Sequence, residues 1–109
     1  MSGKFVVFKG KNGEDYFRLK ASNGEVILSS EGYKSRKSCA NGIESVQKNS
    51  QDESRFEVRE AKDSRTYFVL KAGNGQEIGR SQMYKSSSAC KNGMGSVARN
   101  ATDAAVVEE

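Results

Sequence analysis

A cluster of hydroxyl and cationic side chains around residue 35 is the part of this sequence best suited to binding an anion. Ser35 is a predicted helix N-cap, and the cations Lys34, Arg36 and Lys37 surround it. Free amides at a helix start, together with basic side chains, suit a phosphate group. The plainer interpretation, which the sequence favours, is ordinary N-capping beside solvated lysines. The anion or partner contacts predicted at this helix start and at a second one are Tyr33, Lys34, Ser35, Arg36, Lys37, Tyr84, Lys85 and Ser86.

Other residue types that carry catalysis are absent or unfavourably placed. The chain has no histidine, which removes the commonest general base and the commonest metal ligand. Cys39 and Cys90 lie on apolar helix stripes and outside any Cys-x-x-Cys pair, so we interpret them as buried small hydrophobes. Acidic residues fall mostly in predicted turns, and no glycine-rich phosphate loop occurs. We therefore expect no enzyme activity, no metal and no cofactor.

The sequence contains an internal repeat that determines how these residues are positioned. A shift of 51 residues places Tyr16–Asn49 on Tyr67–Asn100, and 18 of the 34 aligned positions are identical without a gap. Two residues related by this shift are called twins below. The repeat predicts a single domain, residues 1–109, built from a first repeat of about residues 1–54 and a second of about 55–109.

Each repeat changes its hydrophobic period from strand to helix. Alternating apolar residues predict three strands, which in the first repeat present Phe5, Val7, Phe17, Leu19, Ala21 and Ile27 to the core. Asn23-Gly24 and Asn74-Gly75 are strong hairpin signals. An apolar stripe then recurs at i, i+4 and i+7 after Ser35 and Ser86, which predicts a helix in each repeat. The expected fold is α+β, with one antiparallel sheet and two helices on one face.

The opposite sheet face of the first repeat is a second candidate surface. Alternation places aromatic and basic residues there together, and the predicted contacts are Phe8, Tyr16, Arg18 and Lys20. Val6, Val26 and Leu28 are assigned to the same face. Three interpretations remain open: strands that tolerate exposed β-formers, a protein or peptide contact, and a platform for single-stranded nucleic acid.

Charge and length limit the remaining choices. The net charge is +4, a mild basic excess that permits an anionic partner without requiring one. No apolar run is long enough to cross a membrane, and no signal-peptide core precedes the first predicted strand, so a cytoplasmic location is expected. Because duplication supplies the partner half, we expect a monomer with pseudo-two-fold symmetry.

The repeated string Tyr-Phe-x-Leu-Lys-Ala-x-Asn-Gly, followed by Tyr-Lys-Ser and Cys-x-Asn-Gly, resembles the YegP-like family of small bacterial proteins. The chain is similar to the duplicated form of that family from Phe5 to Asn100. The resemblance implies a β-β-β-α-β unit, one continuous sheet and exchange of the final strand of each unit into the other half. On that view Val106-Val107 belongs to a strand, and the stretch around Phe56 links the halves. The family has no established biochemical activity.

These observations favour a non-enzymatic binding or interaction module in the bacterial cytoplasm. Weak binding of nucleic acid or phosphate, through the basic helix starts and the exposed sheet face, is the alternative. The partner is therefore expected to be a protein or a nucleic acid, and the sequence does not name it.

Overall fold

The computed structural model describes residues 3–108; Met1, Ser2 and Glu109, which the predicted domain includes, lie outside the described residues. The elements in chain order are β1 (Lys4–Lys9), β2 (Asp15–Lys20), β3 (Val26–Ser29), α1 (Arg36–Asn49), the 3-10 turn η1 (Glu53–Arg55), β4 (Phe56–Glu60), β5 (Thr66–Lys71), β6 (Glu77–Arg80), α2 (Ser87–Thr102) and β7 (Ala105–Glu108). The β-β-β-α unit predicted from the repeat is thus present twice, and the α+β fold is confirmed.

The seven strands that residues 3–108 form make one sheet in the order β4-β5-β6-β3-β2-β1-β7. The two repeats meet in the middle, where β3 pairs antiparallel with β6 through Ser29 and Arg80. Tight turns with positive φ at Gly24 and Gly75 close the predicted Asn-Gly hairpins. The hairpin between β1 and β2 turns at Asn12-Gly13, and the equivalent hairpin between β4 and β5 has Asp63-Ser64 instead. Ser64 takes the same left-handed conformation as Gly13, at φ 72°.

The C-terminal strand differs in direction from the other six. β7 pairs in parallel with β1, with Val106 beside Phe5 and Val107 beside Val6, so the sheet is mixed rather than wholly antiparallel. The predicted exchange is present for the second repeat, because its last strand completes the sheet of the first. In the first repeat the residues equivalent to β7 are 54–57, and they run directly into β4 instead of forming a separate strand. β4 is therefore the other edge of the sheet.

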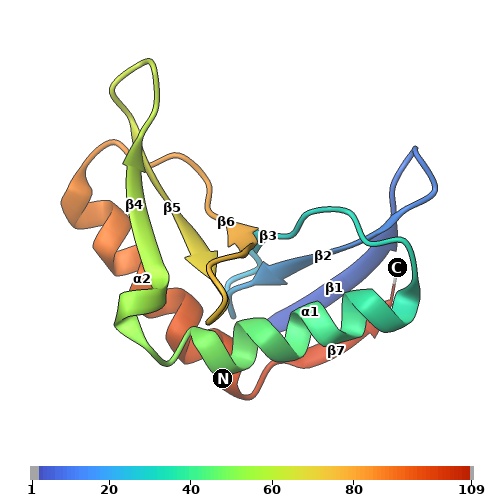
Figure 1. Cartoon of the computed structure of the whole chain (residues 1–109). Coiled ribbons are helices and arrows are strands. Elements are labelled where there is room, and N and C mark those ends of the chain that lie inside the picture. Colours follow the sequence, from blue (N-terminus) through green and yellow to red (C-terminus); the bar gives the residue numbers. More distant parts are fainter. Residues whose placement is uncertain (1–2, 109) are drawn as a thin grey trace.

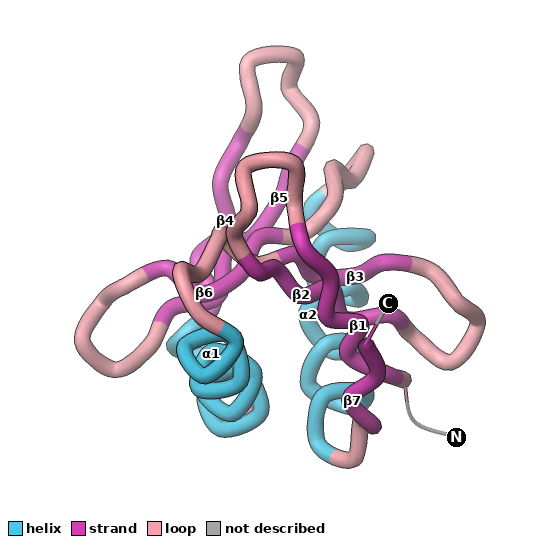
Figure 2. Tube along the Cα trace, turned by 90° about the vertical axis from the view of Figure 1, so that its right-hand side faces the viewer, coloured by secondary structure: helices cyan, strands magenta, loops and turns pink. Residues whose placement is uncertain are grey.

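Both helices lie side by side on one face of the sheet (Figures 1 and 2). The hydroxyls of Ser35 and Ser86 accept backbone N–H groups of the first turns, as predicted for N-caps. α1 packs on β2, β5 and β6, while α2 packs on β1, β2, β3 and β5, so each helix contacts strands of both repeats. The buried cluster accordingly combines Phe5, Phe17, Leu19 and Val46 with Phe68, Leu70 and Val97.

A β-bulge corrects the assignment of Leu28 to the outer face. The register of β2 with β3 shifts between Leu19 and Lys20, so that Leu19 stands opposite Leu28 while Lys20 stands opposite Val26. The extra residue turns Leu28 inward, where it is fully buried in the core. Val6 does lie on the outer face but is only 5% exposed, because it stands between Arg18 on β2 and Val107 on β7.

Candidate functional site

An aromatic–arginine stack, made of Tyr16, Phe8 and Arg18, occupies the outer face of the first repeat. Phe8 on β1 stands opposite Tyr16 on β2, and their rings stack with centroids 5.6 Å apart at an interplanar angle of 16°. The guanidinium carbon of Arg18 lies 4.4 Å from the centroid of the Phe8 ring, within the range of a cation–π contact. Arg18 is exposed, and both rings are half-buried. The structure thus brings together three of the four residues predicted for this face.

The hairpin loop between β1 and β2 fixes the Tyr16 end of the stack. The Asn12 side-chain amide donates to the Tyr16 hydroxyl at 3.0 Å and to the Glu14 carboxylate at 3.1 Å. A Cβ on Gly10 would lie 2.4 Å from the Tyr16 ring, so glycine is needed for the ring to lie along the loop. The aromatic pair is therefore held in place before any partner arrives.

A hollow of about 440 Å³ opens beside the stack. Its lining combines the stack with loop residues and with serines of β3: Phe8, Gly10, Lys11, Asn12, Tyr16, Phe17, Arg18, Ser29 and Ser30. A second hollow of about 320 Å³ shares Ser29 and Ser30 and extends to Arg80 on β6. Lys20, the fourth predicted residue, is half-buried, lies on the same face farther along β2, and does not line either hollow.

The twin face of the second repeat is closed by a network of ion pairs. Arg59, the twin of Phe8, donates to Glu57 on its own strand and to Glu77 on β6 at 2.8 Å. Lys71 donates to the other oxygen of Glu57 at 2.8 Å. These hydrogen bonds, first from Lys71 and then from Arg59, hold the pKa of the Glu57 carboxyl below its ordinary value. The hydrogen bond to Glu57 in turn raises the pKa of the Arg59 guanidinium.

The network covers an apolar residue that replaces a cation. Val69 is the twin of Arg18 and is fully buried, since Arg59 must cross β5 to reach Glu77 from β4. In the first repeat, by contrast, neither Arg18 nor Lys20 forms an ion pair with any described residue. One fold therefore carries two different outer faces: Arg18 and Lys20 of the first are free of ion pairs, whereas their counterparts on the second are a buried valine and a lysine held by Glu57, and only Arg80, which lies over the Tyr67 ring, is exposed there without an ion pair.

Comparison with known proteins places both repeats in one family. The family model described as "Domain of unknown function (DUF1508)" matches residues 10–57 and again residues 61–108. The chain belongs to the DUF1508 family. Each DUF1508 copy thus ends on the strand that follows its helix, which is β7 in the second copy and the start of β4 in the first.

Relatives and solved structures agree with this assignment and are themselves without a described activity. A UPF0339 protein from the ptx operon 5' region of Stutzerimonas stutzeri is 49% identical over 108 residues, covering 99% of this chain and 97% of that protein. The UPF0339 protein YegP of Yersinia pestis is 53% identical over 98 residues, 90% of this chain and 88% of its own. The solution structure of yegP from E. coli, a protein of unknown function, has a TM-score of 0.94 at 43% identity and covers 100% of this chain and 94% of that one.

The DUF1508 helix starts, predicted as anion contacts, are largely engaged within the fold. Arg36 pairs with Asp15 at 3.1 Å and with Glu108 of β7, and Asp15 is only 4% exposed. The second DUF1508 copy replaces this pair by Thr66 and Ser87. Arg36 therefore serves as the counter-ion of a buried carboxylate.

The two tyrosines at the helix starts pack against the core. The Tyr33 ring stacks on Phe17 with centroids 6.1 Å apart, and Tyr84 stacks on Phe68 at 6.2 Å. A Cβ on Gly42 would lie 2.3 Å from the Tyr33 hydroxyl, and one on Gly93 would lie 2.2 Å from that of Tyr84. Burial raises the pKa of both phenols. These contacts explain why tyrosine and helical glycine recur together in both DUF1508 copies.

The remaining helix-start residues divide between capping and solvent. Ser35 and Ser86 use their hydroxyls as caps, whereas Lys34, Lys37 and Lys85 are exposed. The hypothesis of an anion site at these helix starts stays a prediction. It now depends on these lysines, because the other predicted residues have structural contacts.

Both cysteines are free and fully buried, as the apolar stripe predicted. Burial raises the pKa of each thiol, and for Cys39 the neighbouring Asp15 carboxylate raises it further. The raised pKa keeps the reactive thiolate scarce, and burial keeps reagents away from the sulfur.

Sequence reasoning missed the polar residues that line the hollow of about 440 Å³, namely Lys11, Asn12, Ser29 and Ser30. Asn12 carries only a turn signal in the sequence, as part of Asn12-Gly13, and Lys11 carries none. The signal for Ser30 was its identity with its twin Ser81. Both hydroxyls accept the backbone N–H of a β-strand phenylalanine at 2.9 Å, which is a structural role beside the candidate surface.

Proposed function

We propose that this protein is a non-enzymatic binding module and that the outer face of its first repeat contacts an acidic, partly apolar segment of another protein. One observation carries the proposal: the aromatic–arginine stack lies open beside a hollow of about 440 Å³. The second repeat supports the same fold with Arg59 and Val69 in place of Phe8 and Arg18. The fold therefore does not require the stack.

The chemistry of the stack suits a protein partner. Phenylalanine, tyrosine and arginine are enriched where protein interfaces are most buried, because rigid rings bury area at little entropic cost. Arg18 presents a planar fork that fits a carboxylate, and its stacking on Phe8 preorganises that fork. Lys9, Lys11 and Lys20 lie on or near the same hairpin and favour an acidic segment.

A second candidate is weak binding of single-stranded nucleic acid on the same face. The stacked rings of Phe8 and Tyr16 beside Arg18 favour it, because bases stack on aromatic and guanidinium planes. Affinity for a nucleic acid would fall steeply with salt through counter-ion release. Affinity for an acidic peptide held by one Arg fork and two rings would fall less.

A cytoplasmic location is part of the proposal. Its support is that both cysteines are free thiols, the state kept by a reducing compartment. Among residues 3–108, the structure has no helix that is long and apolar enough to cross a membrane.

Affinity capture from a lysate of the native cells, with matched variants, tests the function. Arg18→Glu reverses the charge of the stack at an exposed position, and Arg80→Glu makes the same change above Tyr67 on the second repeat. A protein retained by the wild type and by Arg80→Glu, but about tenfold less by Arg18→Glu, would support the proposal. Equal recovery by both variants would overturn it. Recovery that disappears after nuclease treatment would favour the second candidate.

A further inference from the structure

In the described part of the chain, the sheet edge at β4 lacks the covering strand that the twin edge at β1 has. β1 and β4 are twins by the 51-residue shift, and β7 covers the outer edge of β1. β4 pairs with β5 on one side only, and within residues 3–108 no strand pairs with its other side. No strand of residues 3–108 therefore lies beside β4 at the position related to β7 by the pseudo-two-fold symmetry.

Side chains at the β4 edge are more exposed to solvent than their twins at the β1 edge. Val58 on β4 is 47% exposed, whereas its twin Val7 on β1 is 3% exposed. Phe56 and Met94 are only partly buried, whereas Phe5 is 0% exposed and Ile43 is 4% exposed. Identical or similar side chains thus become exposed where the covering strand is missing.

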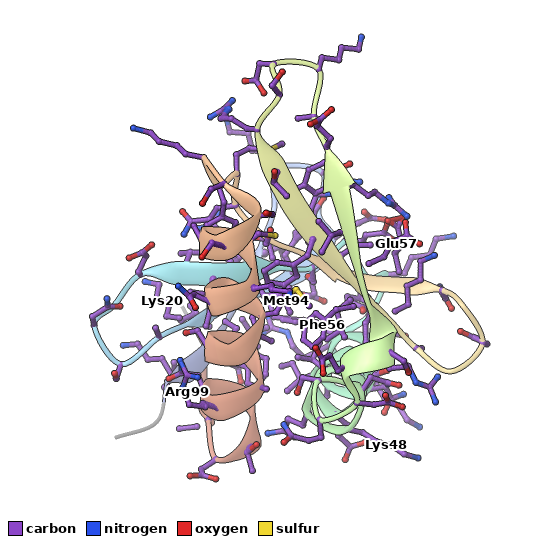
Figure 3. The ribbon with its side chains drawn as sticks, turned by 90° about the vertical axis from the view of Figure 1, so that its left-hand side faces the viewer. Lys20, Lys48, Phe56, Glu57, Met94 and Arg99 are labelled. Carbon is purple, nitrogen blue, oxygen red and sulfur yellow. The ribbon has the colours of Figure 1, made fainter. Side chains whose placement is uncertain are left out.

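A groove accompanies this exposed edge. It has a volume of about 340 Å³ and runs between the start of β4 and α2. Its apolar side is lined by Phe56, Met94, Gly95 and Ala98, and its polar side by Ser50, Gln51, Glu53 and Lys91. Figure 3 shows Met94 and Phe56 between the helix and the strand, with Glu57 on the opposite side of β4. An extended segment beside β4 would place alternate side chains over this groove and the others beside Glu57.

We propose that the β4 edge binds an extended segment of another protein as an added, parallel strand. β7 supplies the template, because it shows in the same chain what the equivalent edge accepts: backbone pairing, with Val106 beside Phe5. Main-chain hydrogen bonds give affinity in strand addition, and alternate side chains give specificity. This surface is separate from the aromatic–arginine stack, and the proposal does not depend on the stack's function.

The differences between the two edges define the occupant's chemistry. At the β1 edge Glu108 stands beside Val7 and pairs with Arg36, but the twin of Arg36 is Ser87, which offers no counter-ion. An apolar residue is therefore preferred beside Val58, and a second one beside Phe56. The residue between them faces Glu57 and its ion-pair network, so a polar side chain fits there. The occupant is an apolar–polar–apolar segment.

A peptide titration tests this assignment. The probe is a synthetic peptide that copies residues 103–109 with the changes Val107→Thr and Glu108→Val, and amide shifts of the full chain are followed by NMR. The chain's own β7 holds the β1 edge at high effective concentration, which leaves β4 for the probe. We expect saturable shifts at Phe56–Glu60 and in the groove-lining part of α2.

Two variants and a modified peptide make the test decisive. Val58→Lys should weaken binding about tenfold, because an edge lysine opposes strand addition. Val107→Lys, at the opposite edge where Val107 is 42% exposed, should leave affinity within about twofold. A backbone N-methylated peptide, which cannot pair, should not bind. The proposal is overturned if β4 amides do not shift, if the N-methylated peptide binds equally, or if the free chain dimerises through this edge and Val58→Lys abolishes the dimer.

Discussion

Leu28 lies directly against Gly79, its own twin, at the centre of the sheet. A Cβ on Gly79 would lie 2.7 Å from a methyl carbon of Leu28, so the leucine occupies the space of the side chain that its twin lacks. Two symmetric positions that meet at a pseudo-two-fold axis cannot both hold a leucine. Duplication within one chain permits the unequal pair, which a symmetric pair of identical units could not have.

Exchanging these two residues provides a stringent test of the shared core. Gly79→Leu alone should destabilise the fold by about 1–3 kcal/mol through overpacking, and Leu28→Gly alone should cost about 2–5 kcal/mol by opening a cavity. The double variant refills the space from the other side and should recover most of the loss. Chemical unfolding measures all three, and additive losses in the double variant would refute the contact.

Two glycines on the same helix should respond to alanine in opposite directions. Gly93→Ala forces a Cβ to 2.2 Å from the Tyr84 hydroxyl, and overpacking of this kind costs about 1–3 kcal/mol. Gly95→Ala would meet only the flexible end of Arg99 at 3.1 Å, so helix propensity should dominate and add up to about 1 kcal/mol. Thermal melts compare them, and Tyr84→Phe should recover part of the loss in Gly93→Ala. Equal effects of the two alanines would contradict the packing described.

The buried Asp15 should be costly only when it loses its partner. Arg36→Ser leaves the Asp15 carboxylate, which is 4% exposed, with Lys9 at 3.6 Å as its remaining counter-ion. The expected loss is about 1–3 kcal/mol, the usual penalty for an under-satisfied buried polar group. Combining it with Asp15→Thr recreates the pair found in the second repeat and should recover most of that loss. A double variant less stable than Arg36→Ser would show that Asp15 is stabilised by other contacts.

Acid should weaken the second repeat's outer face through Glu57. Its pKa in the folded protein lies below the ordinary value of 4.5, so ionisation stabilises the fold above that value and the contribution disappears as pH falls through the lowered pKa. Glu57→Gln should therefore lower the melting temperature at neutral pH, and the difference from wild type should shrink as the pH falls below 4.5. A difference that stays constant across this range would show that the network does not stabilise the fold.

The cysteines should be inert in the native protein. Both thiols are 0% exposed with raised pKa values, so a thiol reagent at mildly alkaline pH should react only as fast as the protein opens. The rate should rise with denaturant in parallel with unfolding. Rapid labelling of one cysteine in native buffer would contradict the burial of that thiol.

Much of the fold follows from local pattern, and the exceptions are those that depend on distant partners. Period-2 alternation placed Phe5, Phe17 and Leu19 in the core, and the serine caps were correct because each uses only its own first turn. Leu28 was misplaced because the bulge adds a residue, and a slip of one residue moves every side chain to the other face. The parallel direction of β7 has no local signal, since it depends on where β1 lies.

The candidate site was predictable in composition but not in arrangement. Alternation placed Phe8, Tyr16 and Arg18 on one face, yet only the structure shows that they stack and that Lys20 does not join them. Arg36 was placed among the candidate anion or partner contacts, which stay a prediction, and no local pattern indicated its ion pair with Asp15, which is distant in sequence but faces it in the fold. The two repeats do differ at both positions together, with Thr66 and Ser87 in place of Asp15 and Arg36, which is consistent with a contact between them.

The most direct test of the central claim is to give the first repeat the outer face of the second. The three changes Phe8→Arg, Arg18→Val and Val26→Glu install the twins Arg59, Val69 and Glu77, while Lys20 already matches Lys71. Val6 is kept, because β7 buries it and a glutamate there would lie beside Val107. The measurement is the amount of partner protein that this grafted chain captures from native lysate, with its melting temperature as the control for folding. We predict a melting temperature close to that of the wild type and capture reduced to the level of bare resin. Undiminished capture by the folded grafted chain would contradict the claim that this face is the contact surface, and a graft that fails to fold would contradict the claim that the stack is dispensable for the fold.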